Sequence, residues 1–176
     1  MTTAHVFIAT SLDGFIARTD GSIDWLLQRD SPDEDHGYQA FIADKERIVM
    51  GRGSYEKVLT FDPWPYDRPV LVMSRQLKEA PPRLQGRVGF SALTPQQLMA
   101  ELSAQQVARI YLDGGQLVQS FLREGLVTDM VITTVPVLLG QGRPLFGPLP
   151  HDLPLQLVSS RSFASGLVQS TYRVPG

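Results

Sequence analysis

The chain lacks cysteine altogether, and its only histidines are His5, His36 and His151. Without cysteine the protein can form no disulfide framework, and a metal site built on thiolate ligands is excluded. The histidines are too far apart in the sequence to show the short spacings that are typical of metal ligands. We therefore predict no metal site.

A strong charge of either sign is also missing, because 16 basic residues stand against 18 acidic ones and the net charge is −2. This balance gives no electrostatic basis for binding nucleic acid or an anionic membrane. No apolar run approaches the roughly 20 residues of a membrane-spanning helix, and no basic segment precedes the first apolar run. We expect a cytoplasmic protein with neither nucleic acid nor a membrane as its partner.

The chain does have enough apolar sequence for a core of its own. It is 176 residues long and 43% hydrophobic, which is typical of a single folded domain. The sequence shows no linker, internal repeat or low-complexity stretch. We predict that residues 1–176 form one domain.

Strand-like and helix-like segments alternate through the first two thirds of the chain. Short runs rich in β-branched and other apolar residues predict strands at 5–10, 47–51, 69–74, 87–91 and 109–113. Apolar residues at helical spacing predict helices at 38–47, 52–61, 94–106 and 115–125. The third of these begins with Thr94 as a cap and Pro95 in the first turn. This alternation is typical of a parallel sheet with helices on both faces.

The last third of the chain contains strand-like runs at 127–140, 154–163 and 167–174 with no helix between them. Strands joined without a helical crossover pair antiparallel. We therefore predict an α/β fold in three layers, αβα, with a mostly parallel central sheet and antiparallel C-terminal strands. A sheet of this kind binds its ligand outside the carboxyl ends of its strands.

One loop at such a strand end contains two adjacent glycines, Gly114 and Gly115, directly before a predicted helix. The helix opens with Gln116, Leu117 and Val118, and free backbone N–H groups at a helix start favour an anion. The missing side chains let a ligand come into contact with the backbone. The alternative is that the two glycines merely make a tight turn.

Two further loops carry a cation beside a hydroxyl group. Gly51, Arg52 and Ser54 follow one predicted strand, and Ser74 and Arg75 follow the next. Hydroxyl and guanidinium groups at neighbouring strand ends suit a long ligand with several phosphates, such as a phosphorylated dinucleotide. The Gly-x-Gly-x-x-Gly fingerprint is absent, which argues against an ordinary Rossmann site.

The order of these motifs resembles the dihydrofolate-reductase-like superfamily, in particular its branch with the reductase domain of riboflavin biosynthesis. The resemblance is carried by SLDGFIA, MGRGSYE, VMSR, YLDGG and VPVLLGQGRPLF. It implies a bacterial reductase that transfers hydride from NADPH to a C=N or C=O bond of a small heterocycle, pterin-like or aminopyrimidine-like. In that branch the activity is that of a 5-amino-6-(5-phosphoribosylamino)uracil reductase.

The resemblance also implies which residues hold NADPH. Ser74 and Arg75 match positions around the 2′-phosphate, and Ala9 and Ile16 match positions whose backbone meets the nicotinamide carboxamide. The adenosine phosphate and the diphosphate are implied to lie against Gly51, Arg52, Ser54, Gly114, Gly115, Gln116, Leu117 and Val118. In relatives the peptide bond between the paired glycines is cis.

Reduction of such a bond also needs a proton, which an acidic side chain or an ordered water can supply. Asp113, Asp30, Asp13 and Asp24 are the candidates for this role, and Asp113 is the preferred polar contact to the substrate. For Asp13 the alternative is a structural one, because Asp before Gly is a common turn pair.

Three residues are candidates for the substrate slot: Asp24, Trp25 and Phe41. The aromatic rings could line an apolar slot for a flat heterocycle, although buried aromatic residues more often fill the core. Asp24 could instead cap the helix that follows it.

Two other functions stay open at this point. One is a true dihydrofolate reductase, which the inserted segment 31–37 before the next helix disfavours, and the other is a catalytically inactive nucleotide-binding module. The resemblance further implies a homodimer that pairs through its late strands, with the apolar run 130–139 as the interface element.

Overall fold

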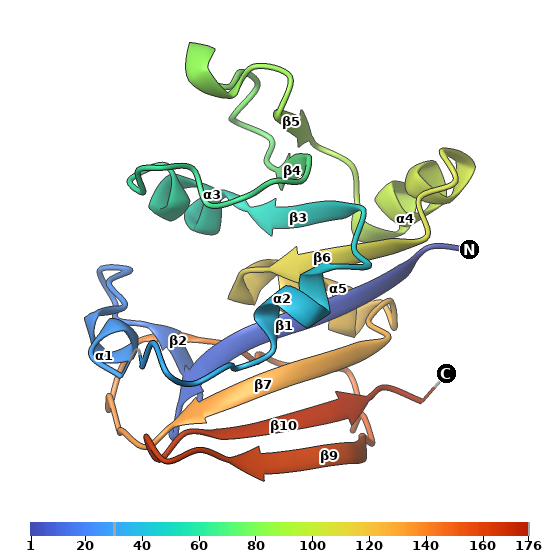
Figure 1. The fold of residues 1–176 in the computed structure, drawn as a ribbon. Coiled ribbons are helices and arrows are strands. Elements are labelled where there is room, and N and C mark those ends of the chain that lie inside the picture. The colour runs from blue at the N-terminus through green and yellow to red at the C-terminus, as the bar shows by residue number, and fades with distance from the viewer. Residues whose placement is uncertain (30, 176) are drawn as a thin grey trace.

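A computed structural model describes residues 1–29 and 31–175, which form one large sheet with helices on both faces (Figure 1). The strands of this sheet are β1 (Thr3–Ser11), β3 (Arg47–Gly51), β4 (Val70–Met73), β5 (Val88–Ser91), β6 (Arg109–Asp113), β7 (Asp129–Val135), β9 (Gln156–Ser162) and β10 (Val168–Arg173). Their order is β5-β4-β3-β6-β1-β7-β10-β9. A separate small pair consists of β2 (Phe15–Ala17) and β8 (Arg143–Pro144).

The strands from β5 to β7 pair in parallel, and β10 pairs antiparallel with both β7 and β9. The predicted fold class, mostly parallel with antiparallel C-terminal strands, is confirmed. Met50 of β3 lies beside Asp113 of β6, and Gly51 lies beside Met73 of β4. The carboxyl ends of these strands therefore meet at one edge of the sheet.

Helices cover the two faces and bury a separate core on each. On one face α2 (Tyr38–Ile42) and α3 (Arg52–Val58) pack over β3 and β4, and on the other α4 (Pro95–Ala104) and α5 (Gly115–Arg123) pack over β6 and β1. Figure 1 shows α2 in front of the sheet and α5 behind it. Two short helical segments, α1 (Asp24–Leu27) and a 3₁₀ turn (Pro82–Leu84), complete the structure.

Local sequence signals explain where α4 begins. The Thr94 hydroxyl accepts a hydrogen bond from the Gln97 N–H at 3.3 Å, and the Gln97 side chain accepts one from the Thr94 N–H at 3.0 Å. This reciprocal pair satisfies two backbone donors that the first helical turn leaves free. The predicted cap is confirmed.

The helix predicted at 38–47 is wrong in length, because α2 ends at Ile42. The guanidinium of Arg68 donates to the carbonyl oxygens of Lys45, at 2.6 Å, and Ala43, at 3.2 Å. Of these, the Ala43 carbonyl is one that a helix reaching residue 47 would have used, and the Glu46 N–H donates to the Arg109 carbonyl at 2.9 Å directly before β3 begins.

The pair β2–β8 was not predicted, because β8 is only two residues long and carries no alternating pattern. Among the described residues, no helix combines the length and the apolar character that crossing a membrane requires.

Candidate functional site

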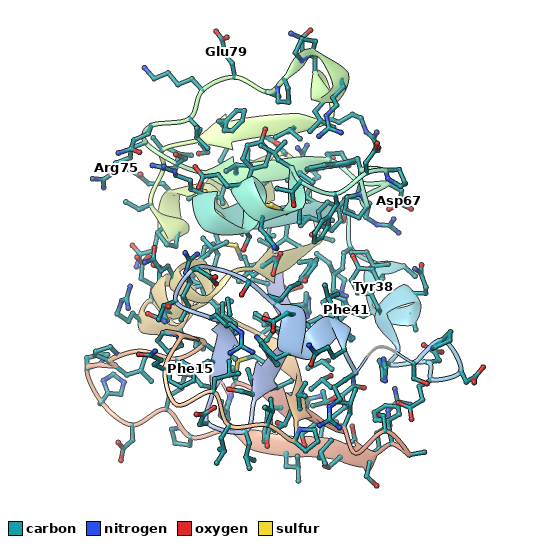
Figure 2. The ribbon with its side chains drawn as sticks, turned by 90° about the vertical axis from the view of Figure 1, so that its left-hand side faces the viewer. Phe15, Tyr38, Phe41, Asp67, Arg75 and Glu79 are labelled. Atoms are coloured by element: carbon teal, nitrogen blue, oxygen red, sulfur yellow. The ribbon has the colours of Figure 1, made fainter. Side chains whose placement is uncertain are left out.

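A cavity of about 1000 Å³ lies at the carboxyl ends of the parallel strands. Figure 2 views the molecule from this side, with Arg75 on one flank and Tyr38 and Phe41 on the other. The residues predicted for the coenzyme that line this one cavity are Ala9, Ile16, Gly51, Arg52, Ser54, Ser74, Arg75, Gly114, Gly115, Gln116 and Leu117. The three loops singled out in the sequence therefore share a single space.

The glycine turn presents backbone donors to this cavity. The first hydrogen bond of α5 runs from the Val118 N–H to the Gly114 carbonyl at 2.9 Å. The N–H groups of Gly115, Gln116 and Leu117 precede that bond, so they are among the donors that a helix start leaves without an intrahelical partner. Together with the helix dipole they form a place for an anion.

Val118 itself lies elsewhere. Its side chain is 0% exposed and packs in the core beneath α5, and its N–H is used within the helix. Val118 therefore lies outside the described cavity lining, and its predicted contact with the coenzyme has no support from this geometry.

Packing within the protein leaves no space for a side chain at either glycine. Gly114 has φ of 103°, and a Cβ there would lie 2.6 Å from the Ser54 hydroxyl oxygen. A Cβ on Gly115 would lie 2.7 Å from the carbonyl oxygen of Pro144 and 2.9 Å from Cδ1 of Ile16. A side chain at Gly115 would collide first with the β8 and β2 segments of the protein itself.

The cis peptide bond implied for the paired glycines is not found. Within residues 1–29 and 31–175 the cis bond is the one between Asp62 and Pro63, and the bond from Gly114 to Gly115 is trans.

The two arginines predicted for the coenzyme differ in their side-chain partners. Arg52 donates to the Glu56 carboxylate at 2.7 Å and to the Gln76 side chain, so its charge is already partly compensated. Arg75 is exposed at the end of β4 beside Ser74, whose hydroxyl accepts the N–H groups of Gln76 and Leu77 at 3.2 and 3.0 Å. Arg75 is thus the freer of the two predicted arginines.

Asp113 stands at the end of β6 in the wall of the same cavity. Burial raises the pKa of this carboxyl to about 6, and a hydrogen bond from the Gly114 backbone opposes part of that rise. Burial also raises the pKa of Tyr66 and of Tyr111, and the nearby Asp113 charge adds to both shifts. The carboxyl therefore lies near tyrosines that stay protonated.

Aromatic side chains build this end of the cavity. Phe7, Phe61, Tyr66 and Tyr111 line it, and the Tyr111 hydroxyl donates to the Phe7 carbonyl at 3.0 Å. Such a wall, with one carboxyl group among rings, is suited to a flat polar heterocycle.

The structure gives the other predicted acids different surroundings. Asp13 accepts the backbone N–H groups of Leu139 and Gly140, at 3.1 and 2.8 Å, and the Ser11 hydroxyl. Its pKa is lowered, chiefly by that hydroxyl. Asp13 therefore joins two loops, and the catalytic role predicted for it has no support. Asp30 lies outside the described residues.

The residues predicted for the substrate slot lie outside the described cavity lining. Asp24 forms an exposed ion pair with Arg18 at 2.7 Å, which lowers its pKa to about 2. Trp25 is 3% exposed and fills a small core with Val135 and Leu167. Phe41 packs one layer behind the cavity, with its ring centroid 5.0 Å from that of Phe7. It supports the wall without forming it.

Several lining residues were not among the predicted site residues, among them Lys57, Tyr66, Ser91 and Arg143. Ser91 ends a predicted strand, so its position at the ligand edge was accessible from the pattern. Tyr66 lies in a proline-rich loop and Arg143 in the two-residue strand β8, where no periodic signal exists.

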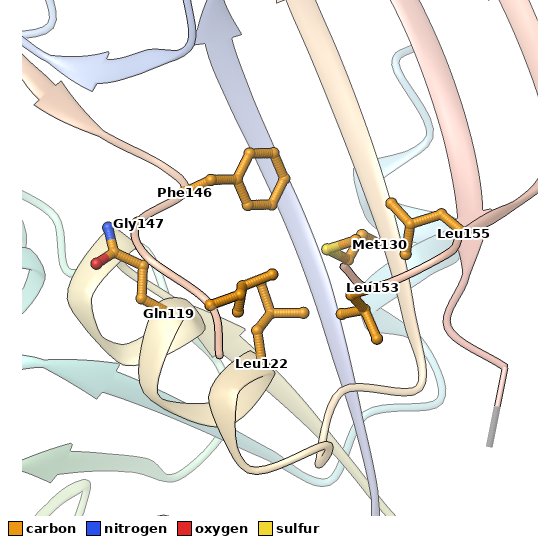
Figure 3. A pocket seen from close by; sticks show the side chains of 8 residues that line it. Gln119, Leu122, Met130, Phe146, Gly147, Leu153 and Leu155 are labelled. Carbon is orange, nitrogen blue, oxygen red and sulfur yellow. The ribbon is translucent and has the colours of Figure 1, made fainter. Parts of the chain in front are cut away.

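A second, smaller pocket of about 190 Å³ lies between α5, β7 and the loop that precedes β9. Figure 3 shows Leu122, Met130, Phe146, Leu153 and Leu155 around it. Its lining is almost entirely apolar, with the Gln119 amide as the polar group. It offers no group for acid, base or phosphate chemistry.

Comparison with known proteins places the chain in a family. The model of the RibD C-terminal domain matches residues 3–169. The chain belongs to this family. A protein of Bacillus subtilis, the uncharacterized YwjB, is 34% identical over 166 residues, which is 92% of each chain.

Solved structures agree with this assignment. A putative riboflavin biosynthesis protein from Shewanella sp. PV-4 is 39% identical, with a TM-score of 0.94 over 99% of this chain and 100% of that one. A diaminohydroxyphosphoribosylaminopyrimidine deaminase/5-amino-6-(5-phosphoribosylamino)uracil reductase from Thermotoga maritima shares the fold, with 15% identity and a TM-score of 0.72 over 99% of this chain and 57% of that one. The predicted family is confirmed, and the chain has a reductase-like fold of the riboflavin pathway.

The glycine turn yields a test of stability. Gly114→Ala combines a positive φ with a contact to Ser54, whereas Gly125→Ala has φ of 66° and nothing within 4 Å of the new Cβ. The Gly125 change should cost about 1–2 kcal/mol through backbone strain alone, and the Gly114 change should cost clearly more. Urea denaturation measures both. Equal losses would show that the Ser54 contact is unimportant.

Asp113 yields a second test, through pH. Its pKa lies near 3.8 when unfolded and about 6 when folded, so the folded state holds the proton more tightly and stability falls as pH rises between these values. Asp113→Asn should therefore raise the free energy of unfolding by on the order of 1–3 kcal/mol at pH 7 and leave it unchanged near pH 3.5.

Urea denaturation at the two pH values measures this difference, with Asp152→Asn as the exposed control. The same gain at both pH values would mean that the carboxylate is not destabilised by burial.

Proposed function

We propose that the protein is an NADPH-dependent reductase of a small heterocycle, pterin-like or aminopyrimidine-like. The observation that carries this proposal is the single cavity in which a glycine turn with free backbone donors, basic side chains and an aromatic wall with a carboxyl group meet. Membership of the RibD C-terminal domain family supports it. When bound, NADPH would supply the hydride.

The residues of the cavity fit this coenzyme. The cavity volume of about 1000 Å³ lies at the upper end of the range for ligand pockets. Such a cavity leaves space for a second small molecule beside the coenzyme. The amides of Gly115, Gln116 and Leu117 would receive the diphosphate at the start of α5. Ser74 and Arg75, at the end of β4, would hold the 2′-phosphate.

Asp113 is proposed to contact the substrate and hold the proton that it needs. A carboxyl group with a pKa of about 6 is protonated in a useful fraction of molecules near neutral pH. Tyr66 would donate a hydrogen bond to a heterocycle at the same end, and the ring of Tyr111, whose hydroxyl donates to the Phe7 carbonyl, would pack against it. The protein from Thermotoga maritima is named as a reductase of an aminopyrimidine, and we propose a substrate of that class here.

The test is a titration of the protein with NADPH and with NADH, followed by nicotinamide fluorescence. NADPH should bind more tightly, and Arg75→Ala should reduce the preference about tenfold, which corresponds to 1.4 kcal/mol, because the 2′-phosphate loses a charged partner. Arg173→Ala, an exposed arginine on β10, is the matched control.

Turnover is then followed as NADPH oxidation with a panel of aminopyrimidines and dihydropterins. Equal affinity for the two coenzymes would remove the 2′-phosphate site. Binding of NADPH without oxidation by any acceptor would favour a nucleotide-binding module, and oxidation by dihydrofolate alone would favour a dihydrofolate reductase.

We further propose a homodimer, formed through β9 and not through the run 130–139. That run contains β7, whose backbone is already paired with β1 on one side and β10 on the other. In contrast β9 is the last strand of the sheet and all of its residues are exposed. An edge strand of this kind presents unpaired backbone groups to a second copy.

The apolar surface beside β9 supports the same interface. Leu157 is 56% exposed, and Phe146, Leu149 and Leu155 at the rim of the smaller pocket are 40–45% exposed. Figure 3 shows Phe146 and Leu155 across that pocket from each other. A second copy would cover this surface, which a monomer leaves in water.

Sedimentation equilibrium tests the dimer. The expected mass is twice the 19.5 kDa of the chain, and Leu157→Asp should shift the protein to a monomer because it places a charge in the interface. Leu27→Asp, at a leucine that is 60% exposed on α1, is the control. A wild-type protein that sediments as a monomer at micromolar concentration would contradict the proposal.

A further inference from the structure

Arg143, which belongs to the motif VPVLLGQGRPLF, lines the cavity although it was not among the residues predicted to hold the coenzyme. It belongs to β8, which pairs with β2 so that Arg143 lies beside Ala17 and Pro144 beside Phe15. This pairing carries the segment across the mouth of the cavity, and Arg143 and Pro144 both form part of its lining.

The guanidinium group lies between two loops. A Cβ built on Gly21 would be 3.2 Å from its Cζ and from both terminal nitrogens, and one built on Gly53 would be 3.7 Å from Nη1. The residue after it, Pro144, has its carbonyl oxygen against Gly115. The Arg143 guanidinium therefore lies between the Gly51–Gly53 turn and the loop that contains Gly21, and the residue after it contacts the Gly115 turn.

The charge of Arg143 has no compensating partner within residues 1–29 and 31–175. Its hydrogen bond is to the carbonyl oxygen of Thr19, at a long 3.4 Å, and none of the ion pairs includes it. Arg52, by comparison, is engaged by Glu56 and Gln76. A guanidinium with free N–H groups beside two glycine turns is suited to bidentate contact with a phosphate.

We propose that Arg143 binds the diphosphate in this cavity, as a diphosphate clamp, in place of Arg52, to which the sequence analysis assigned that contact. The inference rests on the proposed coenzyme and deepens it. The Arg143 guanidinium lies beside Gly53, and Pro144 next to it contacts Gly115, so Arg143 lies on the side of the cavity where the diphosphate would be placed. Arg75, in contrast, lies at the end of β4. The two arginines thus serve different phosphates of one ligand.

The clamp also connects the ligand to the loop around Gly21. Because the guanidinium packs on Gly21 and donates to Thr19, a phosphate that fixes Arg143 also fixes this loop over the cavity. The small size of Gly21 permits this contact, since a side chain there would press on the guanidinium.

The experiment compares Arg143→Gln with wild type by isothermal titration, using ADP-ribose, NADH and NADPH. ADP-ribose carries the diphosphate but neither the nicotinamide nor the 2′-phosphate. All three ligands should bind about tenfold more weakly to the variant, with the ratio of NADPH to NADH affinity unchanged. Arg143→Lys should restore part of the loss because it keeps the charge without the planar fork.

Two controls separate this effect from others. Arg75→Ala should change NADPH affinity and leave ADP-ribose affinity unaltered. The unliganded Arg143→Gln protein should keep its thermal midpoint, because the side chain is exposed and has one long hydrogen bond.

The inference is overturned if Arg143→Gln binds ADP-ribose as wild type does, or if it loses affinity for NADPH alone. A wild-type protein that binds none of the three ligands would overturn the inference and the proposed function together. ADP-ribose binding that depends on Arg143, in a protein that oxidises no NADPH, would support the clamp and reject only the reductase.

Discussion

The parallel pairing of β1, β3, β4 and β6 is the constraint on which the cavity depends. Parallel strands in register end at the same edge, so the chain must turn back there after every strand. Each turn leaves backbone donors and a few side chains pointing past the sheet. Helix α5 adds its first amides to this edge, because Gly114 bends the chain sharply between β6 and the helix.

The same edge contains groups that a stable fold alone would not select. A carboxyl group at Asp113 loses hydration in the cavity wall, and Gly114 adopts a φ that side chains rarely tolerate. The Gly114 conformation is also explained by its packing against Ser54, but a carboxyl group buried beside a large cavity is typical of a site shaped for a ligand. Ordinary interactions, such as the capping box of α4 and the two apolar cores, supply stability elsewhere.

The sequence predicted well those features that depend on local pattern. Short apolar runs identified the strands, and their alternation with helices gave the parallel order, which in turn brought Ser54, Ser74 and Gly115 to one cavity. It failed where contacts between distant residues decide the outcome. Arg68 binds carbonyl oxygens at the C-terminal end of α2, where the helix was expected to continue. Trp25 packs in a core with Val135 and Leu167, which are far from it in the sequence.

The contacts of Asp13 also join residues that are distant in the sequence, and they connect two loops at the cavity. Its carboxylate holds the amides of Leu139 and Gly140, more than 120 residues away, and β2 is bonded to β8 beyond them. The early and late loops that border the cavity are therefore fastened into one panel. A displacement of one of these loops is therefore expected to move the other with it.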